Sequence, residues 1–321
     1  ALATGNTVVL KPAEFTPLSA SLWPGIFEEA GLPAGVFNMV HGYGEEGFAG
    51  DSLVKHPDVP MISFTGESLT GQIISANAAP YLKSLSMELG GKSPAIVFED
   101  ADLDTAIDAT VFGVFSLNGE RCTAGSRIIV QRSIYDRFVA EFTERASRIP
   151  VGDPTDPNTI VGPMISQGHL AKVRHYIELG PKEGAEITTG GLDAPDKLPD
   201  RVKAGNFVRP TVFANVRNDM QIAQDEIFGP VACIIPFDDE AEALAGRVTS
   251  AFQAPFSAGG GPLQVTVTIG ISRYPLEART QTDHISSAEA AVAYAKFQQA
   301  IDRATTDVWR SHTGRVSRGR I

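Results

Sequence analysis

Residues 7–40 read TVVLKPAEFTPLSASLWPGIFEEAGLPAGVFNMV, and this stretch predicts one strand-helix-strand unit. The β-branched run Thr7–Leu10 is typical of a short strand. Thr16-Pro17 offers a helix cap with proline at the first helical position. Apolar residues then recur at four-residue spacing, which predicts one buried helix face formed by Leu18, Leu22 and Ile26. The Gly31–Pro33 segment predicts the end of that helix, and Val36–Val40 is the next strand.

The alternation of strand and helix continues to Phe98. The sequence predicts a strand at Met61–Phe64, a helix near Leu69–Ala78, and strands around Leu85 and at Ala95–Phe98. Such alternation is the signature of βαβ units. We therefore expect an α/β fold with a doubly wound, Rossmann-like parallel sheet, whose ligands bind outside the carboxyl ends of the strands. We also expect this first set of elements to form a hydrophobic core of its own.

A second α/β unit begins at Asp102. Its first helix is predicted by an apolar stripe at helical spacing, formed by Leu103, Ile107, Val111, Val114 and Phe115. This helix runs toward Cys122. A strand at Arg127–Val130 and an amphipathic helix at Ile134–Ile149 follow. The fold class is therefore a doubly wound parallel sheet plus a second α/β domain.

Composition excludes several classes of function. The chain has 321 residues, 43% hydrophobic and 20% charged, as expected of about two soluble domains. The net charge of −11 argues against a nucleic-acid or anionic membrane surface, because phosphate contacts need clustered Lys and Arg. No apolar run is long enough for a membrane span. The two cysteines are too few for a disulfide framework, so we expect a cytoplasmic protein with a small-molecule partner.

Metal binding is not predicted. The six histidines show no metal-ligand spacing, so we assign no metal. His169 and His175 are expected to lie on the faces of one polar helix.

Two motifs point to chemistry when they occur together. MELGGKSP occupies Met87–Pro94, and NGERCTAGSR occupies Asn118–Arg127. A lone cysteine near a helix end is more often a packing residue than a nucleophile. Both motifs, however, resemble the signature sites of the aldehyde dehydrogenase superfamily. Three further segments resemble family motifs and stand in the family's order: TGNTVVLKPAE at Thr4–Glu14, ISFTGE at Ile62–Glu67 and DEIFGPV at Asp225–Val231.

The resemblance implies a catalytic pair. Cys122 is the expected nucleophile, because a thiolate adds readily to an aldehyde and later leaves from a thioester. Glu88 is the expected general base, which deprotonates the water that hydrolyses the thioester. Without the cysteine, Glu88 would read as a solvated loop carboxylate and Gly90-Gly91 as a simple turn.

The resemblance also implies NAD as the cofactor. The positions that match the family's cofactor-binding residues are Lys11, Glu14, Gly44, Gly66, Leu89, Glu226 and Phe228. A carboxylate at Glu14 accepts hydrogen bonds from ribose hydroxyls and repels a 2′-phosphate, which favours NAD over NADP. The alternatives are an exposed ion pair for Glu14 and ordinary turns for Gly44 and Gly66. Glu67 departs from the family, where many relatives carry a serine beside the pyrophosphate, and the hydroxyl of Ser68 is a substitute.

The details of the motifs most resemble the semialdehyde dehydrogenases of aromatic-acid breakdown that act on 5-carboxymethyl-2-hydroxymuconate semialdehyde. Betaine aldehyde and succinate semialdehyde stay open as substrates. Three hypotheses follow for the chain. It is a dehydrogenase, or a truncated or fused chain that binds nucleotide without turnover, or, from the resemblance of its C-terminal segment described below, a cyclic-dinucleotide signalling module.

We divide the chain into a partial NAD-binding domain at 1–100, a partial catalytic domain at 101–243 and a foreign segment at 244–321. The family carries its oxyanion asparagine upstream of the position of Ala1, so we expect that donor to be missing. The family's subunit-joining strand is also expected to be missing after residue 243, although the family is homo-oligomeric.

The segment after residue 243 has a different resemblance. LAGRVTSAFQAPFSAGGGPLQVTVTIGISRYP, residues 244–275, resembles the closing part of a GGDEF (diguanylate cyclase) domain, with a strand at Val265–Ile271. Arg303–Ile321 is expected to be a basic tail. Because this segment cannot replace the missing dehydrogenase strands, we expect an exposed sheet edge or apolar patch near Val231–Pro236.

Overall fold

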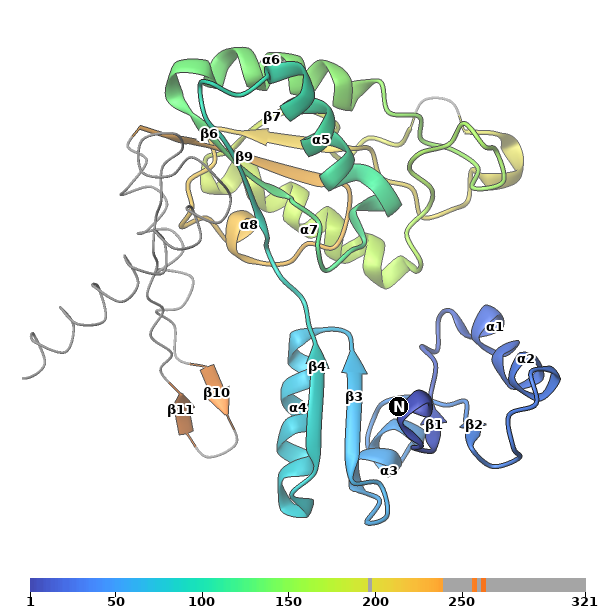
Figure 1. Cartoon of the computed structure of the whole chain (residues 1–321). Helices are drawn as coiled ribbons and strands as arrows, with labels where there is room; N and C mark the ends of the chain where they lie inside the picture. Colours follow the sequence, from blue (N-terminus) through green and yellow to red (C-terminus); the bar gives the residue numbers. More distant parts are fainter. Residues whose placement is uncertain (196–197, 239–255, 259–260, 264–321) are drawn as a thin grey trace, which may run out of the picture. The chain divides into compact units, whose positions relative to one another are not determined.

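The structure is a computed structural model, and it describes residues 1–195, 198–238, 256–258 and 261–263. Helices and strands alternate along most of this part of the chain, which confirms the α/β class (Figure 1). In the described residues, no helix is long and apolar enough to cross a membrane.

The first ninety-three residues form two separate pairs of parallel strands. β1 (Val8–Leu10) pairs with β2 (Phe37–Met39), and β3 (Met61–Thr65) pairs with β4 (Ser84–Glu88). The segments between and before these strands are helical: η1 (Leu2–Thr4), α1 (Pro17–Ala20), α2 (Trp23–Glu29), α3 (Ala49–Lys55), α4 (Ser68–Ala78) and η2 (Ala79–Tyr81). Each pair is thus a strand-helix-strand unit of the kind that the sequence predicts.

The first predicted helix differs from expectation. The structure has two short helices, α1 and α2, in place of one. Pro24 lies at the start of α2, where its missing N–H is tolerated, but inside one continuous helix it would break the hydrogen-bond ladder. The predicted buried face is therefore wrong, because its members Leu18, Leu22 and Ile26 are all exposed.

The prediction that the first unit builds its own core is also wrong. Among the aliphatic and aromatic side chains of residues 1–93, only Pro12, Val54 and Ala78 are buried. Two unjoined pairs of short strands cannot bury a continuous apolar surface as one wide sheet would. Large apolar side chains such as Phe15 and Leu69 consequently remain exposed.

A five-stranded sheet organises residues 94–238 (Figure 1). Its strands lie in the order β5 (Pro94–Val97), β6 (Arg127–Gln131), β9 (Val231–Phe237), β8 (Thr211–Ala214) and β7 (Glu186–Thr189). β5 runs parallel to β6 and β8 parallel to β9, whereas β7 is antiparallel to β8. β5, which the sequence analysis assigns to the first domain, is hydrogen bonded in this second sheet, and the division into three domains stays a prediction.

The connections of this sheet are helical: α5 (Leu103–Phe115), η3 (Ser116–Gly119), α6 (Arg132–Ser147), α7 (Gln167–Glu183), η4 (Asp200–Val202) and α8 (Gln221–Gln224). α5 begins where the sequence predicts, because the Asp102 carboxylate accepts a hydrogen bond of 2.8 Å from Thr105 N. The predicted strand at Arg127–Val130 and the helix after it are confirmed as β6 and α6.

Two hydrophobic clusters cover the two faces of the sheet. One joins α5 and α6 to Ala232 and Ile234 of β9. The other joins α7 and α8 to Val231, Cys233 and Ile235 of the same strand. Alternate residues of β9 thus enter opposite clusters, as the two-residue period of a strand requires.

The expectation of an exposed edge near Val231–Pro236 is wrong. β9 lies between β6 and β8, so it is a central strand. The side chains of Val231 through Ile235 are all fully buried. Within the described residues, β9 is therefore paired on both sides and covered on both faces.

Little of the C-terminal segment falls within the described residues. β10 (Phe256–Ala258) and β11 (Gly261–Leu263) pair in a separate two-stranded sheet. The predicted strand at Val265–Ile271 and the basic tail lie outside the described residues, so the resemblance to a GGDEF domain stays a prediction.

Candidate active site

Cys122 lies in the loop that joins α5 to β6, and its side chain is exposed. The helix ends at Phe115, and the chain then turns sharply through three consecutive residues with positive φ: Leu117 at 52°, Asn118 at 59° and Gly119 at 69°. Left-handed backbone is uncommon outside glycine and is held by the surrounding structure. This turn lifts the cysteine off the helix and presents it in a loop.

Two glycines let the cysteine loop lie against a second loop. A Cβ on Gly119 would come within 2.2 Å of the carbonyl oxygen of Gly229. A Cβ on Gly229 would come within 2.7 Å of Val173 Cγ2 on α7. Both distances are too short for any other residue, so the turn at Gly119 and the segment after Phe228 depend on each other. Both glycines stand inside the motifs at Asn118–Arg127 and Asp225–Val231, but the sequence alone does not show that they meet.

Glu88 is the last residue of β4, and its side chain is exposed. Its carbonyl oxygen accepts a hydrogen bond of 3.0 Å from Gly66 N. Three residues further along, an added Cβ on Gly91 would lie 3.5 Å from the carbonyl oxygen of Cys122. The two signature motifs, which are far apart in sequence, therefore meet at Gly91.

Glu226 enters the same place from the loop before β9. Gly91 N donates a hydrogen bond of 3.2 Å to Glu226 Oε1. A Cβ on Gly90 would lie only 2.0 Å from Glu226 Oε2, so the absence of a side chain at Gly90 makes room for the carboxylate. Phe228, two residues later, has a left-handed φ of 59°. Gly90-Gly91 is thus more than a simple turn, because it seats a predicted cofactor-binding residue.

Lys11 and Glu14 follow β1 and form an ion pair, with Lys11 Nζ 3.1 Å from Glu14 Oε2. Lys11 Nζ also donates to the carbonyl oxygens of Pro12 and Gly42. A hydrogen bond from the backbone, followed by the bond from Lys11, holds the pKa of Glu14 below its ordinary value. Glu14 is therefore ionised at neutral pH. The ion pair that stood as the alternative reading is present, and a role toward a ribose stays a prediction.

The remaining predicted cofactor positions in the first part of the chain are Gly44, Gly66 and Leu89. A Cβ on Gly66 would meet the ring of Phe64 at 2.5 Å, whereas a Cβ on Gly44 would meet nothing within 4 Å. Packing therefore explains the glycine at 66 and gives no reason for the one at 44. The Leu89 side chain packs against Gly71 of α4, where a Cβ would lie 2.6 Å from Leu89 Cδ2. Glu67 is exposed, and its carboxylate lies 3.8 Å from Lys172 Nζ.

Lys92 is a buried cation directly after the Gly90-Gly91 turn. Its ammonium nitrogen is buried and has no hydrogen-bond partner. Burial lowers the pKa of Lys92, and the carboxylates of Asp225 and Glu226 oppose this shift only in part. The sequence motif contains this lysine, but its burial could be found only from the packing.

His169 is a site residue that the sequence analysis missed. It lies in the first turn of α7, which Ser166 caps through a 3.1 Å hydrogen bond from His169 N. His169 Nε2 is 2.6 Å from the carbonyl oxygen of Phe228 and 3.3 Å from Glu120 Oε1. The polar helix is confirmed, but His169 faces the two loops of the site and His175 is exposed. The sequence around His169 contains no pattern that predicts its contact with these two loops.

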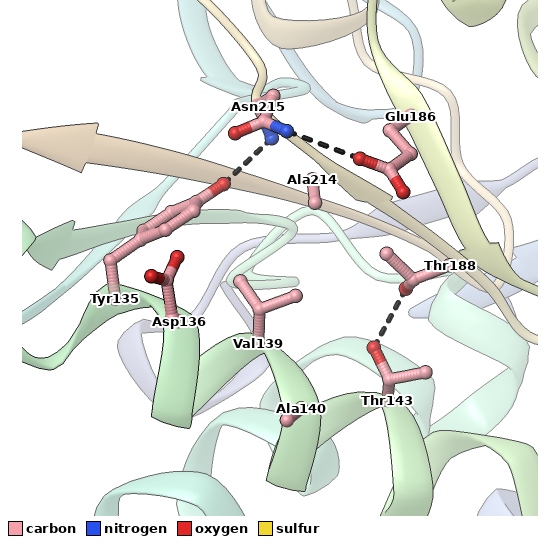
Figure 2. A pocket seen from close by; sticks show the side chains of 9 residues that line it. All are labelled: Tyr135, Asp136, Val139, Ala140, Thr143, Glu186, Thr188, Ala214 and Asn215. Atoms are coloured by element: carbon pink, nitrogen blue, oxygen red, sulfur yellow. Dashed lines mark hydrogen bonds between the residues drawn. The ribbon is translucent and has the colours of Figure 1, made fainter.

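A pocket of about 280 Å³ lies elsewhere, between α6 and the strands β7 and β8. Figure 2 shows that Tyr135 receives a hydrogen bond from Asn215 N and that Thr143 contacts Thr188 across it. None of the predicted site residues lines this pocket. In the described part of the chain, no group of three or more His, Cys, Asp or Glu side chains is arranged to hold a metal ion.

A loop cysteine on a mixed α/β sheet approaches the glycine pair that follows the strand-end Glu88, and both lie in motifs that resemble one family. The chain belongs to the aldehyde dehydrogenase family, whose pattern matches residues 1–248. It is 59% identical over 243 residues to 5-carboxymethyl-2-hydroxymuconate semialdehyde dehydrogenase of Escherichia coli, a match that covers 76% of this chain and 51% of the relative. Betaine aldehyde dehydrogenase of Sinorhizobium fredii is 48% identical over 246 residues, covering 76% and 49%.

Solved structures agree with these relatives. The HpcC protein of Thermus thermophilus is 52% identical with a TM-score of 0.74, covering 80% of this chain and 49% of that chain. An aldehyde dehydrogenase of Bacillus cereus, solved as its NAD⁺ complex, is 42% identical with a TM-score of 0.73, covering 79% and 50%. The chain thus spans about half the length of the relatives that it matches.

Proposed function

We propose that this chain carries the site of NAD-dependent aldehyde oxidation, with Cys122 as the nucleophile and Glu88 as the general base. The observation that supports the proposal most is the meeting of the two motifs at Gly91, whose backbone lies against the carbonyl of Cys122. The exposure of Cys122 agrees with this role, because a nucleophile must be accessible to its substrate.

The chemistry proceeds through a covalent adduct. The Cys122 thiolate forms a carbon–sulfur bond to the aldehyde carbon, and the carbonyl electrons move to oxygen. The backbone N–H of Cys122 is the donor that this chain itself offers to the oxyanion. When the oxyanion collapses, hydride leaves and a thioester remains. Glu88 then takes a proton from water, the water oxygen adds to the thioester carbon, and collapse releases the carboxylic acid and the thiolate.

NAD fits the residues present, and when bound it supplies the acceptor for the hydride. Glu226 is seated by Gly90 and Gly91 beside the cysteine loop, where its carboxylate can accept hydrogen bonds from ribose hydroxyls. Glu14, ionised beside Lys11, can do the same for the adenosine ribose and would repel a 2′-phosphate. Gly44, Gly66, Leu89 and Phe228 complete the proposed set.

The proposed substrate is a semialdehyde such as 5-carboxymethyl-2-hydroxymuconate semialdehyde. Its support is the 59% identity to the Escherichia coli dehydrogenase named for that compound. Betaine aldehyde stays as the alternative, because a relative named for it is 48% identical.

The proposal is tested by replacing Glu88 with Gln and following reduced nicotinamide by absorbance after rapid mixing with aldehyde and NAD. We expect a retained burst of about one equivalent per site and a steady state at least about 100-fold slower, because acylation needs the cysteine and hydrolysis needs the base. Cys122→Ala should abolish both phases. Loss of the burst in Glu88→Gln would assign Glu88 another role. Calorimetric binding of NAD by the parent chain without any turnover would select the alternative, a nucleotide-binding chain that does not catalyse.

A further inference from the structure

His169 joins the two loops of the proposed site. Its Nε2 lies 2.6 Å from the carbonyl oxygen of Phe228 and 3.3 Å from Glu120 Oε1. The carbonyl oxygen of Phe228 only accepts hydrogen bonds, so Nε2 carries a proton and donates it to that oxygen, while Glu120 Oε1 is a close polar neighbour without a hydrogen bond. Phe228 follows Glu226 in the proposed cofactor loop, and Glu120 stands two residues before Cys122. One imidazole nitrogen thus reaches the loop of the nucleophile and the loop of the cofactor.

The contact is built into the packing. The imidazole of His169 lies edge-on to the Phe228 ring, with centroids 6.1 Å apart. Glu120 Oε1 is buried and has no hydrogen-bond partner, which is costly for a carboxylate oxygen, and His169 Nε2 lies 3.3 Å from it. The Phe228 backbone has a left-handed φ of 59°, which the surroundings must hold in place. His169 therefore contacts a buried carboxylate of one loop and the strained backbone of the other.

α7 holds the cofactor loop at two points. Tyr176, on the same helix as His169, donates a hydrogen bond of 2.9 Å to Asp225, and burial together with that carboxylate raises the pKa of Tyr176 to about 12. Tyr176 contacts only the cofactor loop by hydrogen bond, whereas His169 reaches both loops. His169 thus adds a polar link between the nucleophile loop and the cofactor loop to the close approach of Gly119 and Gly229.

We propose that His169 is a positioning residue that sets the geometry between Cys122 and the cofactor held by Glu226 and Phe228. It acts through Glu120 and the Phe228 carbonyl and does not touch the reacting atoms. The inference rests on the proposed function for its catalytic consequence. Its structural part, the coupling of the two loops, can be measured with the full chain whether or not NAD binds.

The test uses His169→Ala, His169→Gln and, as a matched control on the same helix, His175→Ala. Hydrogen exchange by mass spectrometry is followed in peptides that contain residues 117–122 and 226–229, and NAD affinity is measured by calorimetry. His169→Ala should speed exchange in both peptides and raise the dissociation constant for NAD by about tenfold, the effect expected from one lost buried hydrogen bond. His169→Gln keeps an N–H donor at a similar reach, so it should stay within about twofold of the parent. His175→Ala should match the parent.

The outcomes separate the two proposals. If the parent chain binds no NAD, the proposed function fails, and the exchange data alone decide whether His169 couples the loops. Unchanged exchange in both peptides of His169→Ala would overturn the inference. So would faster exchange in only one loop, or a His169→Gln variant that behaves like His169→Ala, because either result would reduce His169 to ordinary packing.

Discussion

At the scale of single residues, the two cysteines have opposite environments. Cys122 is exposed in a loop, whereas Cys233 is fully buried in β9 and its Sγ faces the carbonyl oxygen of Ile222 at 3.3 Å. Burial raises the pKa of the Cys233 thiol, which keeps it protonated and inert.

We predict that iodoacetamide modifies Cys122 at least about tenfold faster than Cys233 in the folded chain, because only an accessible thiolate reacts. Peptide mass spectrometry after timed alkylation measures both rates. Labelling in denaturant is the control and should bring the two rates together. Equal rates in the folded chain would contradict the assignment of Cys122 as the reactive thiol.

The buried lysine gives a prediction about pH. The pKa of Lys92 is lowered in the folded chain by burial, so the unfolded chain binds more protons between that lowered value and the ordinary value of about 10.4. Stability from this group therefore rises as pH rises through that window. Replacing Lys92 with Met should stabilise the chain at pH 7 by on the order of 1 kcal/mol, and the advantage should shrink toward pH 10.

Urea unfolding of the parent and of Lys92→Met at several pH values measures this difference. Lys182→Met is the control, because Lys182 is exposed on α7 and should leave the pH dependence unchanged. A Lys92→Met advantage that is constant from pH 7 to 10 would show that packing alone causes it.

At the scale of elements, short glycine segments bring the loops of the site together. Gly90 and Gly91, which follow the end of β4, lie against Glu226 and Cys122. Gly119, the last residue of η3, lies against Gly229. A Cβ would clash with its neighbour at Gly90 and at Gly119, whereas at Gly91 it would make only an ordinary van der Waals contact. The positions of these loops therefore depend on the missing side chains at Gly90 and Gly119 as well as on the side chains around them.

We predict that Gly90→Ala displaces the Glu226 carboxylate while leaving the fold intact, because the clash is with the end of a flexible side chain at 2.0 Å. The dissociation constant for NAD should rise by about tenfold, as expected when one cofactor contact is lost. Calorimetry measures the affinity and thermal unfolding the stability. Gly113→Ala in α5, where a Cβ meets nothing within 4 Å, should keep the affinity and raise stability by about 0.5–1 kcal/mol. Unchanged affinity in Gly90→Ala would argue against a cofactor role for Glu226.

At the scale of the whole molecule, burial is distributed unevenly along the chain. The five-stranded sheet has a hydrophobic cluster on each face, whereas residues 1–93 bury only Pro12, Val54 and Ala78 among their aliphatic and aromatic side chains. Local opening follows the amount of buried apolar contact, so the two regions should open with different free energies.

We predict that amides of β9 exchange at least about 100-fold more slowly than those of β1 and β3. Hydrogen exchange followed by mass spectrometry on the full chain measures this ratio. A first region as protected as the sheet around β9 would contradict the prediction, and would mean that residues 1–93 are covered by other parts of the protein.

The sequence by itself determined the α/β class, most of the elements and the family. Strand and helix periods are local properties, and the motifs around Glu88 and Cys122 are contiguous, so both can be read without a structure. The start of the second unit at Asp102 was predicted for the same reason. The roles of the cofactor residues remain proposals.

The tertiary structure alone decided which surfaces are buried and which loops meet. The apolar face of Leu18, Leu22 and Ile26 is a valid helical pattern, but among the described residues no element buries it, so its side chains are exposed. Val231–Pro236 was expected at an edge, and it became central because β6 and β8 pair on either side of it. His169 gave no signal in sequence, because its two partners come from loops separated from it by long stretches of chain. Burial, strand neighbours and long-range hydrogen bonds depend on chain segments that only folding brings together.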